Sequence, residues 1–146
     1  MAEEAFNEEK QALIRGAIQQ AELETSGEIK VHIENHCKED TLDRAAYIFE
    51  QLHMHETALR NGVLIYLALK DKQFAILGDV GINQRVEDGF WDKISSLMMS
   101  YFKKGEYTQG LVEGILGAGE QLKAHFPYQS DDQNELSNDI SFGKND

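Results

Sequence analysis

Cysteine, proline and uninterrupted apolar segments are all scarce in this chain. The single cysteine, Cys37, excludes an intramolecular disulfide and any zinc or iron–sulfur centre built from several cysteines. No apolar run approaches the roughly 20 residues that a membrane-spanning helix needs. The first residues, MAEEAFNEEKQ, lack the basic and apolar regions of a signal peptide. We therefore expect a cytoplasmic protein without a membrane partner.

Positive charge is also scarce. The chain has 14 lysine and arginine residues against 26 aspartates and glutamates, which gives a formal net charge of −12. Nucleic acid is not an expected partner, because binding its phosphates requires clustered basic side chains. Divalent cations are compatible with this charge, since acidic loops bind them through oxygen atoms. The other interpretation is that most of the acidic residues form solvated surfaces.

The 146 residues contain segments of helical and of strand periodicity that fit one domain. Helices are expected at about residues 7–24, 42–54, 87–102 and 107–124, and strands at 28–33, 63–69 and 74–77. The first strand alternates between apolar and polar residues, which predicts burial on one face, near a sheet edge. Residues 63–69 are almost continuously apolar, as in a strand covered on both faces. Thr41 is the expected N-cap of the second helix, and a tight turn is expected at residues 70–72.

The last helix and the C-terminal segment have unusual compositions. Glycines interrupt the helix repeatedly, which predicts close packing against a neighbouring element, because each glycine costs about 1 kcal/mol relative to alanine. Residues 128–146 contain five acidic side chains and one lysine, and few apolar ones. We expect residues 1–127 to form the domain and residues 128–146 to be a disordered acidic tail. Residues 140–142 could instead dock on a partner.

Two loops carry the best candidates for a functional site. The loop after the first strand contributes Glu34, Asp40 and Asp43. The loop after residues 74–77 contributes Asp79, Glu87 and Asp88, with Asp92 one helical turn further on. Loops that follow strands running in the same direction lie at the same edge of a sheet.

If the two loops meet, their carboxylates repel each other unless a cation bridges them. Oxygen ligands favour Ca²⁺ or Mg²⁺ over zinc or copper. We therefore predict a divalent-cation site whose metal orders both loops and regulates an interaction with a protein that the sequence does not identify. Asp79 and Asp88 are the strongest candidate ligands. The structural interpretation is that Glu87 and Asp88 stabilise a helix N-terminus and Asp79 makes a turn.

The alternative function is a weak metal-dependent acid phosphatase. In this hypothesis a metal-activated water near Asp79 is the nucleophile, and Arg60 or Arg85 binds the phosphate. The spacing from Cys37 to Arg44 does not match the phosphate loop of cysteine phosphatases.

Four segments together resemble the TPM domain family. They are AELETSGEIKVHI (21–33), ETALRNGVLIYLAL (56–69), AILGDVGINQRV (75–86) and FKKGEYTQGLVEGI (102–115), and their order and spacing match the family across nearly all of residues 6–126. The resemblance implies divalent-metal binding in loops beside the sheet and, in some members, acid phosphatase activity. Periodicity and resemblance both predict an α/β fold, a three-layer α/β/α sandwich around a small, about four-stranded mixed sheet.

Overall fold

A computed structural model describes residues 2–128 and 137–143. The elements follow in the order η1 (Ala2–Ala5), α1 (Glu8–Glu22), β1 (Glu28–Glu34), α2 (Thr41–Gln51), η2 (Met54–Glu56), β2 (Gly62–Ala68), β3 (Gln73–Gly78), α3 (Val80–Asn83), α4 (Asp92–Phe102), α5 (Tyr107–Leu122) and β4 (Ser141–Phe142). None of the described helices is long and apolar enough to cross a bilayer.

The described strands form one mixed sheet in the order β3-β2-β1-β4. β1 is parallel to both β2 and β4, whereas β3 is antiparallel to β2. The antiparallel pairing follows from the short connection between β2 and β3, because only a tight turn joins them and it reverses the chain. The predicted turn at residues 70–72 is present, with Lys72 at φ 56°.

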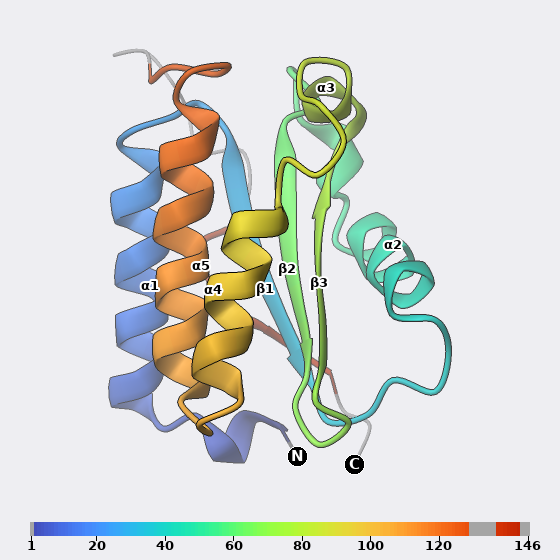
Figure 1. The fold of residues 1–146 in the computed structure, drawn as a ribbon, viewed down its shortest axis with the longest axis vertical. Coiled ribbons are helices and arrows are strands. Elements are labelled where there is room, and N and C mark those ends of the chain that lie inside the picture. The colour runs from blue at the N-terminus through green and yellow to red at the C-terminus, as the bar shows by residue number, and fades with distance from the viewer. Residues whose placement is uncertain (1, 129–136, 144–146) are drawn as a thin grey trace.

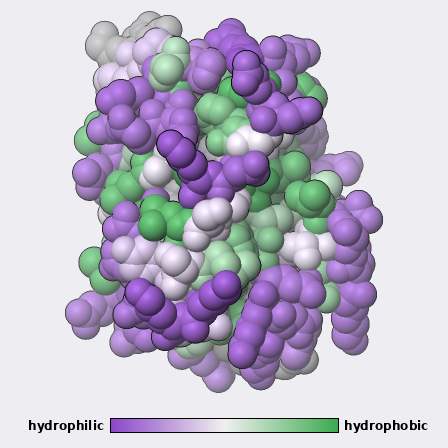
Figure 2. All heavy atoms as spheres, in the orientation of Figure 1, coloured by the Kyte–Doolittle hydropathy of each residue, from purple (hydrophilic) through white to green (hydrophobic). Residues whose placement is uncertain are grey.

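Helices cover both faces of this sheet, which confirms the α/β/α sandwich (Figure 1). On one face α1, α4 and α5 enclose the main core, where α5 lies between the other two helices. On the other face α2 packs against β2 and β3 around a smaller core. In the same orientation, hydrophilic side chains dominate the visible surface of the molecule (Figure 2). Apolar side chains are visible mainly in the middle of this view.

The helix termini refine the predictions from the sequence. The side chain of Asn7 caps α1 by accepting the Lys10 backbone N–H at 2.9 Å. The N-cap of α2 is Asp40 and not Thr41, because the Asp40 carboxylate accepts the backbone N–H groups of Leu42 and Asp43, the second and third residues of the helix. The predicted helix at 87–102 begins only at Asp92, after Gly89 adopts the left-handed conformation at φ +82°.

The glycine-rich helix α5 packs as predicted. A Cβ atom on Gly114 would overlap the Met98 side chain on α4, and one on Gly119 would approach the Ala21 Cβ on α1 to 2.8 Å. The absent side chains therefore allow α5 to lie close to both of its neighbours.

The prediction of a disordered tail is wrong for residues 137–143. β4 continues the sheet beside β1, and Ile140 and Phe142 pack against the main core. The remainder of the predicted tail, residues 129–136 and 144–146, lies outside the described residues. The 140–142 patch thus docks within its own chain, because the edge of β1 offers both unpaired backbone groups and apolar surface.

Candidate functional site

The two acidic loops lie at opposite ends of the sheet. The loop that contains Asp40 leaves the end of β1, where β2 also ends, and leads into α2, which contains Asp43. Because β3 runs the other way, its end at Gly78 lies beside the start of β2, and Asp79 follows at that opposite edge. The expectation that both loops share one ion is therefore wrong. The physical reason is the β2–β3 hairpin, which places consecutive loops at alternate ends of a sheet.

Asp79, the first of the predicted ligands, is engaged in a structural ion pair. Its carboxylate oxygens accept from Arg60 Nε at 2.8 Å and from an Arg60 terminal nitrogen at 2.9 Å, and one also accepts the Val80 backbone N–H at 2.7 Å. Asp79 thereby joins the segment before β2 to the start of α3. Gly81 completes this packing, since a Cβ there would overlap the Leu59 and Arg60 carbonyl oxygens.

Glu34 is fully buried and also paired. Arg44 donates to both of its oxygens, at 2.8 and 3.0 Å, and the Tyr66 hydroxyl donates to Oε2. Burial alone raises the pKa of Glu34, but hydrogen bonds with His32, Arg44 and Tyr66 outweigh it and hold the pKa well below its usual range. Tyr66 responds in the opposite sense: burial and the bond to Glu34 raise its pKa. Glu34 is therefore a permanently ionised structural group.

A buried polar cluster thus surrounds Glu34, and sequence analysis missed it. His32 Nε2 lies 3.2 Å from Glu34 Oε1, and His32 Nδ1 lies 2.7 Å from Ser141 Oγ on β4. The His32 ring stacks on the Tyr66 ring with centroids 6.0 Å apart. These residues, with Arg44, form what we call the Glu34 cluster. The sequence signal for this cluster was a row of polar residues on one face of β1, opposite a tyrosine in β2. Alternation alone assigns such polar residues to solvent, so it does not predict the cluster.

The loop between α3 and α4 holds two further predicted ligands, Glu87 and Asp88. Glu87, Asp88 and Asp92 surround a cavity of about 240 Å³ whose other lining residues are Asn83, Val86, Gly89, Phe90 and Trp91. All three acidic residues are exposed, and among the described residues none forms an ion pair or a side-chain hydrogen bond. The carboxylate of Asp92 folds over Gly89, whose hypothetical Cβ would lie 2.9 Å from it.

This loop therefore has free carboxylates, but they do not converge. Across the described residues, no three histidine, cysteine, aspartate or glutamate side chains are placed to hold a metal ion. The two remaining predicted ligands, Asp40 and Asp43, belong to the first turn of α2, where Asp40 is the N-cap. Of the six predicted residues, only Glu87 and Asp88 share one loop with a third free carboxylate.

The arginines considered for phosphate binding are also engaged. Arg60 is held by Asp79, as described above. Arg85 donates to the His125 carbonyl oxygen at 2.9 Å, and its guanidinium lies 4.5 Å from the centroid of the Phe126 ring. Both contacts use the groups that would have to bind a phosphate.

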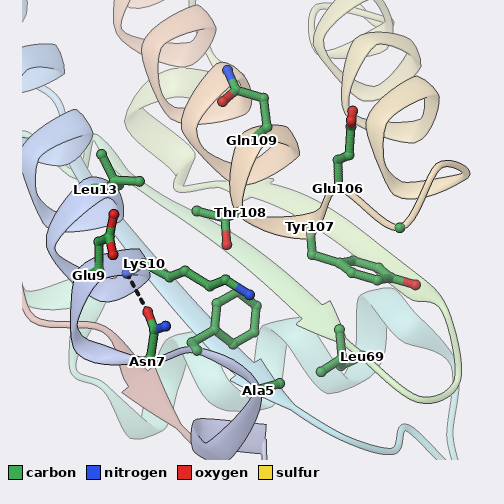
Figure 3. A pocket seen from close by; sticks show the side chains of 12 residues that line it. Ala5, Asn7, Glu9, Lys10, Leu13, Leu69, Glu106, Tyr107, Thr108 and Gln109 are labelled. Atoms are coloured by element: carbon green, nitrogen blue, oxygen red, sulfur yellow. Dashed lines mark hydrogen bonds between the residues drawn. The ribbon is translucent and has the colours of Figure 1, made fainter.

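A larger pocket of about 590 Å³ opens between the start of α1 and the start of α5 (Figure 3). Leu13, Leu69 and Tyr107 contribute apolar surface, and the Lys10 side chain extends across the opening. The other lining residues are Ala5, Phe6, Asn7, Glu9, Gly105, Glu106, Thr108 and Gln109. The lining of this pocket contains no histidine, cysteine or predicted site residue.

Known proteins resemble this chain in both sequence and fold. The BA42 protein of the psychrophilic bacterium Bizionia argentinensis, solved by NMR, is 49% identical, with a TM-score of 0.88 over 92% of this chain and 93% of its own. The N-terminal domain of a P. gingivalis protein matches at 18% identity and a TM-score of 0.64, over 82% of this chain and 78% of that one.

The N-terminal domain of the Corynebacterium glutamicum cg2496 protein matches at 12% identity and a TM-score of 0.63, over 95% of this chain and 80% of that one. These two distant similarities show a shared fold. None of the curated proteins matches the chain. The sequence profile of the TPM domain matches residues 2–121. With this match over most of its length, the chain belongs to the TPM domain family.

Proposed function

We propose that this TPM domain binds one divalent cation, Ca²⁺ or Mg²⁺, at the loop between α3 and α4. The observation that supports the proposal is the grouping of Glu87, Asp88 and Asp92, three exposed carboxylates without a cationic partner, around one cavity. Their mutual repulsion is relieved when a cation enters. The net charge of −12 further favours cations near the surface.

The ligands would be oxygen atoms only. Glu87, Asp88 and Asp92 supply carboxylates, and the loop's backbone carbonyls and the Asn83 side chain supply neutral oxygens. Such a mixed set of oxygens suits Ca²⁺, which takes six to eight ligands in flexible geometry, better than Mg²⁺, which requires a near-ideal octahedron. Glu34, Asp40, Asp43 and Asp79 have no part in this site, because the fold places or pairs them elsewhere.

Cation binding would order this loop. The three carboxylates do not converge without metal, so binding requires the loop to close around the ion. A cation at a hundredfold excess over its dissociation constant stabilises the bound state by about 2.7 kcal/mol. This free energy is sufficient to hold the loop in one conformation, which would make the domain a metal-responsive interaction module.

An NMR titration with Ca²⁺ and, separately, Mg²⁺ tests the proposal. We expect amide shifts confined to residues 83–92, with saturation at one ion per chain. Asp88→Asn should weaken binding by about tenfold or more, because it removes a charged ligand. Asp43→Asn is the matched control, since it removes the same charge at the opposite end of the sheet. Equal affinities of both variants, or shifts outside this loop, would contradict the proposed site.

A further inference from the structure

The C-terminal segment 137–143 lies along the edge of β1, on a surface that we call the groove and that comprises Lys30, His32, Ile33 and Glu34. Ser141 and Phe142 pair in parallel with His32 and Ile33, and the Gly143 backbone N–H donates to the Ile33 carbonyl at 2.8 Å. This segment, red in Figure 1, is distant in sequence from β1 and from every residue of the other sheet strands. It forms the fourth strand with only two paired residues.

One part of the groove binds main-chain atoms. Lys30 is buried, with 9% of its surface exposed, and its ammonium group donates to the carbonyl oxygens of Ser137, at 3.1 Å, and Asp139, at 2.8 Å. Any extended chain presents such carbonyls, so these contacts do not depend on the side chains of the occupant. The backbone hydrogen bonds that the edge of β1 makes with the segment are likewise independent of side chains.

A second part of the groove selects side chains. His32, oriented by Glu34, contacts the Ser141 hydroxyl. Two residues later, a Cβ on Gly143 would lie 2.5 Å from Glu34 Oε1 and 3.2 Å from His32 Nε2, so a side chain has no room there. On the other face of the segment, Ile140 and Phe142 contact the main core. The groove therefore fits the pattern apolar–Ser–aromatic–Gly.

The groove lies within the part of the chain that matches the TPM domain, whereas the segment that covers it does not. Lys30, His32 and Glu34 lie within the family-matched residues 2–121. Residues 140–143 lie outside that match and are only half-buried. The family-matched residues thus supply the binding surface, and a short segment outside the match covers it.

We propose that this groove along β1 is a peptide-binding site that the chain's own residues 137–143 close. A partner protein would bind by inserting an extended segment with the pattern apolar–Ser–aromatic–Gly parallel to β1, in place of the chain's own segment. This is recognition by strand addition, in which the backbone contributes affinity and alternate side chains contribute specificity. A tethered segment competes at an effective concentration on the order of millimolar, so it excludes weak or mismatched partners.

The test uses the full chain and a fluorescent peptide of sequence SNDISFG, residues 137–143. Phe142→Ala loosens the chain's own segment by removing an apolar anchor, and Gly143→Val does so by steric overlap with Glu34. Fluorescence anisotropy should show the peptide binding both variants about tenfold or more tightly than the wild-type chain, because the tethered competitor is weakened. A peptide with valine in place of its glycine and a scrambled peptide are the matched controls, and neither should bind.

NMR spectra of the variants decide the structural side of the test. Unchanged core amide signals confirm that each variant is folded, and the peptide should restore the wild-type shifts of His32 and Ile33. The proposal is overturned if the segment is released in both variants, as sharp signals of residues 137–143 would indicate, and the peptide still does not bind. It is also overturned if the wild-type chain forms dimers by exchanging this segment, because the occupant is then a second copy.

Discussion

Glu22 offers the sharpest test of the energetics of this fold. It lies in the last turn of α1, where its Oε2 accepts the Ile29 backbone N–H at 3.1 Å. Burial raises the pKa of Glu22 from 4.5 to about 7, with a smaller contribution from the nearby Glu28 carboxylate, although the Ile29 bond and Lys30 act in the opposite direction. The folded protein therefore retains a proton at a pH where the unfolded chain has lost it.

The sign and size of the effect follow by linkage. Between pH 4.5 and about 7 the folded state binds more protons at Glu22 than the unfolded state, so the free energy of unfolding falls as the pH rises through this range. The stabilising contribution of the protonated side chain is complete below pH 4.5 and lost above about 7. The full difference in pKa corresponds to about 3 kcal/mol. Because the side chain is partly exposed, solvent screening reduces this to about 1–3 kcal/mol.

Glu22→Gln removes the titration and keeps an oxygen acceptor for Ile29. At pH 8 the variant should be more stable than the wild type by about 1–3 kcal/mol, or about 3–9 °C in melting temperature, and at pH 4.5 the difference should nearly vanish. Urea unfolding at several pH values measures both quantities. Glu24→Gln changes an exposed neighbour and is the control. A Glu22→Gln variant that is destabilised equally at every pH would refute the reasoning.

Further predictions concern packing and charge. Arg60→Ala should lower the free energy of unfolding in urea by more than an exposed ion pair contributes, because it leaves the buried Asp79 carboxylate unpaired. Arg15→Ala, which breaks an exposed ion pair, should cost less than about 1 kcal/mol; equal costs would show that burial does not determine the energy of these pairs. Gly114→Ala should lower stability by about 1–3 kcal/mol, because its Cβ overlaps a methionine on α4. Gly16→Ala, where a Cβ meets nothing within 4 Å, should raise stability by about 0.5–1 kcal/mol in the same assay, and a loss there would contradict the argument.

Much of the architecture follows from local patterns. The continuous apolar run produced β2, in which all seven residues are buried, and the first helix lies within the predicted range 7–24. The direction of β3 was also implied locally, because a tight turn between adjacent strands makes a hairpin. The turn was predicted, and a hairpin at that position puts the ends of β2 and β3 at opposite edges of the sheet. The acidic loops were nevertheless expected at one edge.

The candidate site was predicted less completely. Glu87 and Asp88 remain candidates because they are exposed in a loop of free carboxylates. Asp79 and Glu34 do not, because each is paired with an arginine that only the fold brings near, Arg60 and Arg44 respectively. A carboxylate's partner is a long-range property, and residue type and spacing do not report it.

The sequence by itself determined the helices, the central strands and the glycine-lined contacts of α5, because these depend on the period of apolar residues and on the absence of side chains along one segment. Only the tertiary structure decided that the polar face of β1 is buried. Lys30 and His32 lose their water to residues 137–143, more than 100 positions away in the chain. Alternation reports the face of a strand that each side chain occupies, but whether that face contacts water depends on which distant segment covers it.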